Sequence, residues 1–262
     1  MARIAVAATA PFGADTLARL AERHDIAYLL TRPDRPQGRG RKVAAPPAKE
    51  IAERLGIEVR QPERLDDFQP SVETVVAVAY GVLIPDPVLE RALWLNVHPS
   101  LLPRWRGAAP VERGLMAGDR ETGVTIIKLV PELDAGPVAA QECFAVGEDD
   151  DAGAVYARAA EVSVPLVGRA LEGAELREQE GEPTYADKIT AADRELDWSR
   201  PARELHDRIR ALSPHIGARG EIDGHRAIVW RSRLRDGELE LLEVQPEGGR
   251  RMTYDEFLRG RC

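Results

Sequence analysis

The stretch TVVAVAYGVLIPDPVLERALWLNVH, residues 74–98, decides the fold class. It begins with Thr74–Tyr80, an apolar run rich in β-branched side chains, which is typical of a buried strand. A short helix is expected at Pro87–Ala92, and a second apolar run at Leu93–His98 predicts the next strand. A strand, a helix and a strand in this order favour a parallel sheet with right-handed crossovers.

The chain on both sides of this stretch continues the alternation of strands and helices. Apolar runs predict further strands, and amphipathic runs predict helices, the first of them with Asp15 as its N-cap. The expected strands are Arg3–Ala10, Ile26–Leu30, Gly123–Val130 and Gly136–Val146, and the expected helices are Thr16–Arg23, Pro47–Leu55 and Asp149–Leu171. The sequence therefore predicts an α/β protein with a mostly parallel sheet.

A change in composition divides the chain near residue 180. Charged residues, glycine and proline gather between Gly173 and Thr184, as is typical of a linker. After it, a helix is expected at Pro201–Leu212, and two alternating stretches around Asp236–Gly237 predict a β-hairpin, Arg226–Leu234 and Glu238–Val244. We therefore expect one domain at residues 1–180 and a small β-rich domain at residues 181–262.

The overall charge limits how the protein can meet a nucleic acid. Lys and Arg number 36 against 44 Asp and Glu, so the net charge of −8 repels phosphates unless a local basic patch exists. Two cysteines in 262 residues favour a reducing compartment over a disulfide scaffold. No secretory signal and no apolar stretch of about 20 residues, the length of a membrane span, is visible. A cytoplasmic monomer without membrane contact is expected.

One basic loop stands out against this acidic background. The run RPDRPQGRGRK at residues 32–42 holds five cations and one carboxylate, Asp34, and so carries a local charge of +4. Such a loop is either a solvated surface or a phosphate contact. Its cations are Arg32, Arg35, Arg39, Arg41 and Lys42.

Three polar residues are candidates for acid/base chemistry. Asn96 and His98 lie two apart on a predicted strand, so both project from one face near its C-terminal end, where open α/β sheets bind ligands. An amide stabilises an oxyanion and an imidazole moves a proton, which suits acyl transfer. Asp134 either orients His98 or serves an ordinary turn. The alternative for Asn96 and His98 is a turn cap and a hydrogen-bonded strand-end histidine.

These residues lie in motifs that resemble a known family, the folate-dependent formyltransferases. NVHPSLLPRWRG at 96–107, AGDRETGVTI at 117–126 and LDAG at 133–136 carry the resemblance, which extends over nearly the whole chain. Within the family, three further segments resemble the branch that acts on charged initiator tRNA: TRPDRPQGRGRK at 31–42, VAYGVLIP at 78–85 and YADKITAADRELDW at 185–198.

The resemblance implies a fold, an activity and a set of site residues. It implies the formyltransferase fold, with a Rossmann-like N-terminal domain and a shortened, barrel-like C-terminal domain that belongs to a tRNA-binding type. The activity implied is transfer of the formyl group of 10-formyltetrahydrofolate, a co-substrate, to the amino group of methionine on charged initiator tRNA, with no metal. Asn96 would hold the formyl oxygen, His98 would be the acid/base, and Asp134 would set the charge and orientation of His98.

The same resemblance implies two binding surfaces. The basic loop at 32–42 would grip the acceptor arm of the tRNA, through the five cations named above. The predicted folate contacts are Tyr80, Gly81, Leu83, Ser100, Leu101, Leu102 and Pro103.

Two other functions stay open from the sequence. The Asn, His and Asp set is shared by the wider family, so the acceptor could instead be an amino-sugar nucleotide or a ribonucleotide amine. The third reading is an RNA-binding or folate-sensing module that keeps the fold without catalysis.

Overall fold

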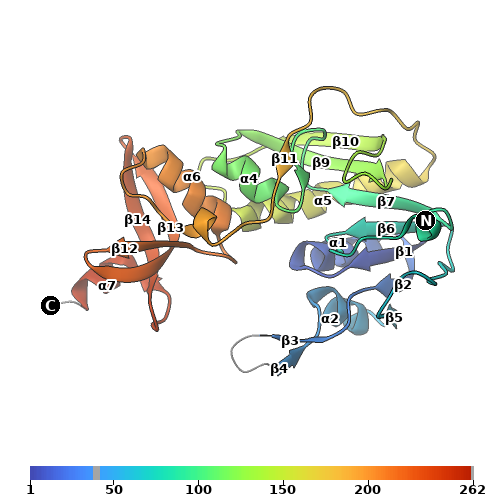
Figure 1. The fold of residues 1–262 in the computed structure, drawn as a ribbon, viewed down its shortest axis with the longest axis horizontal. Helices are drawn as coiled ribbons and strands as arrows, with labels where there is room; N and C mark the ends of the chain where they lie inside the picture. Colours follow the sequence, from blue (N-terminus) through green and yellow to red (C-terminus); the bar gives the residue numbers. More distant parts are fainter. Residues whose placement is uncertain (38–41, 261–262) are drawn as a thin grey trace. The chain divides into compact units, whose positions relative to one another are not determined.

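A seven-stranded sheet forms the core of the computed structural model, which describes residues 1–37 and 42–260. The strand order is β10-β9-β7-β6-β1-β2-β5 (Figure 1). β1 pairs in parallel with β2 and β6, β6 with β7, and β2 with β5, whereas β9 is antiparallel to β7. The strands span Arg3–Ala8 (β1), Asp25–Leu30 (β2), Val59–Arg60 (β5), Thr74–Val78 (β6), Leu93–His98 (β7), Glu121–Lys128 (β9) and Val138–Ala145 (β10). The mostly parallel α/β sheet predicted from the sequence is confirmed.

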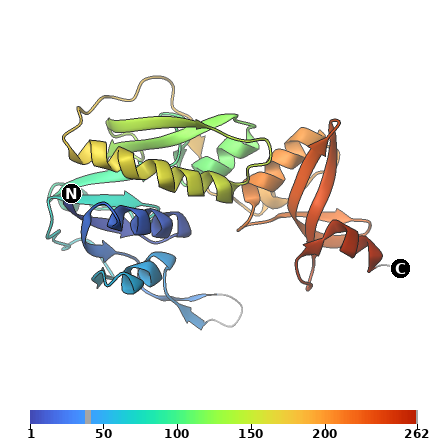
Figure 2. The same cartoon turned by 180° about the vertical axis from the view of Figure 1, so that it is seen from behind.

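The apolar runs form strands because both faces of the central sheet are covered. Ile4–Ala8 and Thr74–Val78 are buried along their whole length, as parallel strands with protein on both sides are. Three helices lie on the same side of the sheet in Figure 2. They are α1 (Pro11–Ala21), α2 (Pro47–Arg54) and α5 (Ala152–Leu171).

The first helix begins earlier than the sequence pattern indicated. α1 starts at Pro11 with Ala10 as its N-cap, so the predictions of a start at Thr16 and a cap at Asp15 are wrong. Proline suits the first helical position because its ring presets the helical φ and its missing N–H has no intrahelical partner there. Asp15 instead pairs with Arg19 one turn on, at 3.1 Å.

Several short elements had no prediction from the sequence. Most span two or three residues, too few to show a period. They are β3 (Arg35–Gln37), β4 (Lys42–Ala44), β8 (Arg106–Gly107), α4 (Pro110–Met116), β11 (Tyr185–Ala186), the 3-10 turn Ala192–Arg194, β12 (Ala218–Ile222) and β15 (Met252–Thr253). α3 (Asp86–Leu89) lies where a short helix was expected, one residue earlier at its start.

The C-terminal part forms an antiparallel sheet of four strands in the order β12-β13-β14-β15. β13 (His225–Arg235) and β14 (Glu238–Pro246) form the predicted hairpin, and its turn residues Asp236 and Gly237 have φ of 52° and 84°. Two positive φ values are what a type I′ hairpin turn needs. α6 (Ala202–Leu212) and α7 (Tyr254–Arg259) complete this β-rich part.

The chain divides into two compact units, and neither is one continuous segment. Unit 1 comprises residues 1–106, 123–143 and 157–184, and unit 2 comprises 107–122, 144–156 and 185–262. The predicted domain boundary after residue 180 therefore stays a prediction. Among the residues that the structure describes, no helix has the length and apolar character needed to cross a membrane.

Candidate active site

The three predicted catalytic residues converge in unit 1. Asn96 and His98 share one face at the C-terminal end of β7, and Asp134 comes from the loop between β9 and β10. Asn96 Nδ2 lies 3.4 Å from Asp134 Oδ1, and His98 Nδ1 lies 3.6 Å from Asp134 Oδ2. His98 and Asp134 are buried, with 3% and 8% of their surface exposed. An amide, an imidazole and a carboxylate therefore meet around one point.

A backbone carbonyl determines which nitrogen of His98 faces that point. His98 Nε2 lies 2.9 Å from the Trp105 carbonyl oxygen. A carbonyl oxygen accepts hydrogen bonds only, so Nε2 carries a hydrogen and donates it. Nδ1 then faces Asp134 across a distance longer than a hydrogen bond. The nitrogen placed to exchange a proton with a bound group is therefore Nδ1.

The loop that carries Asp134 is folded tightly against the end of β9. Asp134 has a φ of 49°, in the left-handed region that non-glycine residues avoid. Two residues on, a Cβ placed at Gly136 would lie 1.8 Å from the Lys128 carbonyl oxygen. Position 136 therefore requires glycine, and the close approach explains how a carboxylate from a loop reaches the end of β7.

The segment after His98 is held by hydrogen bonds inside the protein. Ser100 Oγ donates to the Arg104 carbonyl oxygen at 2.7 Å. Thr125 Oγ1 donates to the Ser100 carbonyl oxygen at 2.6 Å and accepts from Leu102 N at 3.1 Å. Ser100 and Leu102 are buried, whereas Leu101 and Pro103 are partly exposed. The folate contacts expected at 100–103 stay predictions, and the segment has the rigidity that a binding loop needs.

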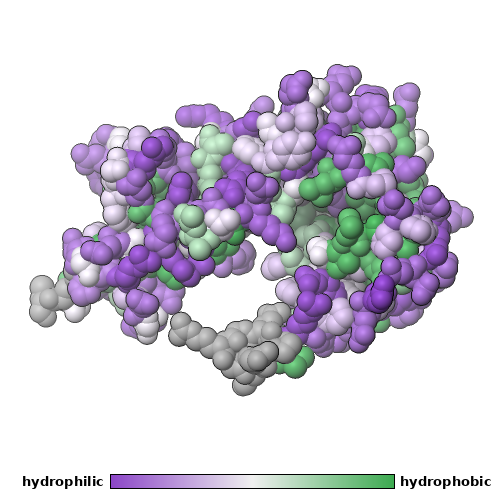
Figure 3. Space-filling model, viewed as in Figure 1, coloured by the Kyte–Doolittle hydropathy of each residue, from purple (hydrophilic) through white to green (hydrophobic). Residues whose placement is uncertain are grey.

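The other predicted folate segment leaves the sheet next to the catalytic strand. β6 and β7 are parallel neighbours, with Ala77 opposite Asn96, so the residues after Val78 begin beside the end of β7. Leu83 is 85% exposed, and Gly81 has a φ of 70°. The space-filling view shows apolar patches interrupting the hydrophilic surface of unit 1 (Figure 3). The folate contacts expected at Tyr80, Gly81 and Leu83 stay predictions.

Tyr80 lies at the start of this segment and is buried. Thr9 Oγ1 donates to its carbonyl oxygen at 2.9 Å. Burial raises the pKa of Tyr80 to about 12, and nearby Arg32 opposes that rise. The phenol is therefore protonated at neutral pH and can donate a hydrogen bond, but not serve as a base.

The structure places the predicted tRNA contacts only in part. Arg32 is half-buried, and a Cβ at Gly81 would lie 4.0 Å from its Nη1, so Arg32 borders the expected folate segment. Arg35 is exposed on β3. Arg39 and Arg41 lie outside the described residues, as does the side chain of Lys42.

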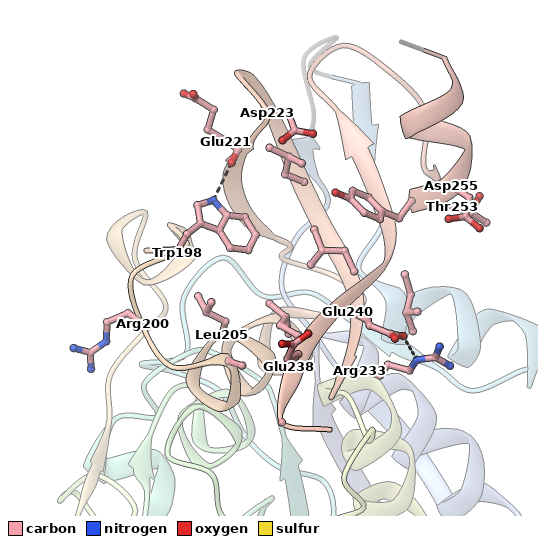
Figure 4. A pocket seen from close by; sticks show the side chains of 17 residues that line it. Trp198, Arg200, Leu205, Glu221, Asp223, Arg233, Glu238, Glu240, Thr253 and Asp255 are labelled. Carbon is pink, nitrogen blue, oxygen red and sulfur yellow. Dashed lines mark hydrogen bonds and ion pairs between the residues drawn. The ribbon is translucent and has the colours of Figure 1, made fainter. Parts of the chain in front are cut away.

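Unit 2 has a concave region of its own, with a volume of about 1080 Å³ (Figure 4). Trp198, which donates to the Glu221 carbonyl oxygen at 2.9 Å, lines one side, and acidic side chains surround the opening. Arg233 and Glu240 pair within the lining. None of the predicted site residues lies there. Across residues 1–37 and 42–260, no group of three His, Cys, Asp or Glu is arranged to hold a metal ion.

Comparisons with known proteins agree with this geometry. The sequence profile described as formyl transferase matches residues 2–171, and the formyl transferase C-terminal domain matches residues 188–238. The chain belongs to the formyl transferase family. The family predicted from the motifs is therefore confirmed.

One relative and two solved formyl transferase structures illustrate the similarity. The methionyl-tRNA formyltransferase of Paracoccus denitrificans is 40% identical over 98% of this chain and 97% of its own length. The methionyl-tRNA formyltransferase from Clostridium thermocellum covers 94% of this chain and 99% of its own, with a TM-score of 0.69 and 16% identity. An N-formyltransferase from Helicobacter canadensis, solved with folinic acid and dTDP-3-aminofucose, covers 90% and 88%, with a TM-score of 0.66 and 17% identity.

Sequence reasoning missed two polar residues, Gln179 and Thr184, that bond to the loops of the candidate site. Gln179 Nε2 donates to the carbonyl oxygens of Asp134 and Gly136, at 2.7 and 2.9 Å. Thr184 Oγ1 accepts from Trp105 N at 2.9 Å. Both lie in the charged segment expected to be a linker, where no local pattern marks them. The resemblance to the family at 185–198, directly after this segment, is the signal that could have drawn attention to it.

Proposed function

We propose that this chain transfers the formyl group of 10-formyltetrahydrofolate to the amino group of methionine on charged initiator tRNA. The observation that carries the proposal is the convergence of Asn96, His98 and Asp134 at the end of β7. Its second support is the 40% identity to a methionyl-tRNA formyltransferase over almost the full length of both chains.

The geometry assigns each group a task in formyl transfer. The folate supplies the formyl carbon, which the amine of the acceptor attacks. The Asn96 amide donates to the formyl oxygen as negative charge develops on it. His98 Nδ1 takes the proton that the amine loses and returns it to the departing folate nitrogen. Asp134, whose Oδ2 lies 3.6 Å from Nδ1, orients the imidazole for both proton transfers.

The long contacts among the three groups suit this sequence of events. Asp134 lies 3.4 Å from the Asn96 amide nitrogen and 3.6 Å from His98 Nδ1. At these distances neither residue makes a short hydrogen bond to Asp134 that a substrate must break. His98 keeps its orientation throughout, because Nε2 is held by the Trp105 carbonyl oxygen. The site is thus oriented before the reaction, which lowers the reorganisation that the chemistry requires.

The proposed partners are folate and charged initiator tRNA. The basic loop at 32–42 is the argument for tRNA as a partner, because an acidic chain needs a local positive charge, here +4, to contact phosphates. The exposed apolar side chains of Val82 and Leu83 are the argument for the folate ring as a partner. A cytoplasmic location follows from the proposed acceptor, because charged tRNA is used in translation. A monomer is the proposed assembly.

A formylation assay with alternative acceptors tests the proposed function. The purified chain is given 10-formyltetrahydrofolate and either methionyl initiator tRNA, an amino-sugar nucleotide or a ribonucleotide amine. We expect formyl-methionyl-tRNA as the preferred product. Preference for a small amine would establish the alternative acceptor, and absence of formyl transfer to all three would leave the non-catalytic binding module.

Charge removal in the basic loop sharpens the same assay. Arg39→Ala with Arg41→Ala should raise the KM for tRNA and reduce the slope of log affinity against log salt by about 1 per lost phosphate contact. Arg3→Ala with Arg64→Ala is the matched control, since both arginines are highly exposed and lie outside the loop. Equal effects of the two pairs would contradict a role for the loop.

A further inference from the structure

The chain returns to the active site after its longest helix. α5 ends at Leu171, and a long connection then runs past β10 to β11 (Figure 1). Within this connection, Arg177 exchanges two backbone hydrogen bonds with Val138, at 2.7 and 2.9 Å. The pairing anchors the connection on the first residue of β10, just after the loop that carries Asp134.

Gln179 closes the Asp134 loop from outside. Its amide nitrogen donates to the carbonyl oxygens of Asp134 and Gly136, while its amide oxygen accepts from Arg106 Nε and Nη2 at 3.1 and 2.8 Å. Two acceptors on one side and a guanidinium on the other determine the orientation of the amide. A carboxylate there would face two carbonyl oxygens, and a cation would face Arg106.

One of the hydrogen bonds from Gln179 ends at the strained residue of the loop, Asp134. Asp134 has a φ of 49°, which persists only where the surroundings hold it. The bond from Gln179 ends on the carbonyl of that same residue, so it fixes the direction in which the Asp134 side chain leaves the loop. That direction sets the distances from the carboxylate to Asn96 and His98.

Thr184 does the same for the loop that holds His98. Trp105 has a φ of 66°, and its carbonyl oxygen accepts the hydrogen of His98 Nε2. Thr184 accepts from Trp105 N through Oγ1 at 2.9 Å, accepts from Arg106 N through its carbonyl at 2.8 Å, and donates its N–H to the Pro103 carbonyl at 3.2 Å. Three hydrogen bonds thus surround the peptide that orients the imidazole.

We propose that Gln179 and Thr184 are positioning residues for formyl transfer. Gln179 sets the carboxylate of Asp134, and Thr184 sets the carbonyl that orients His98. Neither needs to touch a substrate. The inference rests on the proposed function for its kinetic consequences, and it predicts a loss in kcat without a loss in substrate affinity.

Gln179→Glu is the sharpest variant, because it keeps the size of the side chain and the bonds from Arg106. It replaces the amide nitrogen that donates to two carbonyls by an oxygen that repels them. We expect kcat to fall about 10- to 100-fold, since a misplacement near 1 Å reduces rates by such factors. KM for folate and for the acceptor should stay within about twofold.

Gln245→Glu is the matched control. Gln245 also donates to a backbone carbonyl, that of Gly249 at 3.0 Å, and accepts from Trp230 Nε1 at 3.1 Å, but it lies in unit 2. Its kcat should match the wild type after correction for folded fraction.

Thr184→Val should lower kcat, while Thr184→Ser, which keeps the hydroxyl, should restore most of it.

A double-mutant cycle separates positioning from a general structural role. Combined with Asp134→Ala, Gln179→Glu should reduce kcat by less than about twofold further, because the carboxylate it orients is gone. Multiplication of the two losses, or a rise in KM that accounts for the fall in kcat/KM, would overturn the inference.

Hydrogen exchange gives a readout that needs no substrate. Gln179→Glu should increase amide exchange at residues 132–137, and Thr184→Val at residues 103–106, whereas Gln245→Glu should change neither. Unchanged exchange in both loops would refute the positioning role alone. A wild-type chain that formylates no methionyl-tRNA would refute the proposed function alone.

Discussion

Two buried histidines, one in each unit, share one kind of partner and differ in the other, and only His98 belongs to the proposed site. His206, on α6, is 1% exposed, and His98 is 3% exposed. Each places Nε2 against a backbone carbonyl oxygen, that of Glu148 at 3.0 Å and that of Trp105 at 2.9 Å. Both rings are therefore fixed in orientation, and both carry the hydrogen on Nε2.

The second ring nitrogen makes the difference. His206 Nδ1 lies 3.0 Å from Ser232 Oγ, which can donate to it, so the neutral ring has both its hydrogen-bonding needs met. His98 Nδ1 instead faces the Asp134 carboxylate at 3.6 Å. A carboxylate also lies near His206, since Asp149 Oδ1 is 3.8 Å from Nε2, but that nitrogen already bonds to the Glu148 carbonyl oxygen. Of the two rings, His98 is the one whose Nδ1 faces a carboxylate in place of a hydroxyl. This difference supports His98 as the proposed acid/base.

The largest expected effect follows from removing the reactive histidine. His98→Ala should lower single-turnover formyl transfer by about 10²–10⁴-fold, the range for loss of a general acid/base. His206→Ala is the paired control and should change the rate per folded molecule little. A loss below about tenfold for His98→Ala would break the comparison.

Removing the amide should have the next largest effect. Asn96→Ala takes away the donor beside the formyl oxygen, and we expect a loss of about 10²–10³ in rate, roughly 3–4 kcal/mol. The measurement is single-turnover formylation at saturating folate. Undiminished chemistry would remove Asn96 from the mechanism.

The structural histidine should affect stability instead of rate. His206→Ala leaves the Glu148 carbonyl and the Ser232 hydroxyl without this partner, so the free energy of unfolding should fall by about 2–3 kcal/mol. Urea denaturation measures the change. If His98→Ala destabilised the protein as much, the distinction between the two rings would fail.

The smallest effect concerns a half-buried acid of unit 2, Glu112. Burial raises the pKa of Glu112, and a hydrogen bond from the Tyr156 hydroxyl at 3.0 Å opposes that rise. With the folded pKa above the unfolded one, the stabilising contribution is present below the unfolded value and is lost as pH rises through the folded pKa.

Replacing that acid by its neutral isostere tests the sign. Glu112→Gln keeps an acceptor for Tyr156, so it should stabilise the protein at pH 7 by less than about 1 kcal/mol and leave stability unchanged near pH 4. Unfolding by urea at the two pH values is the measurement. A gain at pH 4 that equals the gain at pH 7 would contradict the assignment.

The two-residue repeat of a β-strand was enough to predict that Asn96 and His98 lie on one face, because the alternation of side chains along a strand is a local property. The same reasoning could not place Asp134 beside them, since 36 positions of chain separate it from His98 and no local pattern encodes the distance. The start of α1 was mistaken because the amphipathic pattern begins at Thr16, while Pro11 at the first turn marks the true start. That error arose because one residue outweighed a periodic signal.

Local chemistry by itself determined the alternation of strands and helices, the family and the residue types at the site. Apolar periodicity and a short motif are enough for these, because they act over a few neighbouring residues. The tertiary structure alone decided that Gln179 and Thr184 bond to the strained loops, and that Nδ1 faces a carboxylate in His98 and a hydroxyl in His206. Such contacts join residues remote in the chain, and their energy depends on which donors and acceptors the fold brings within about 3 Å.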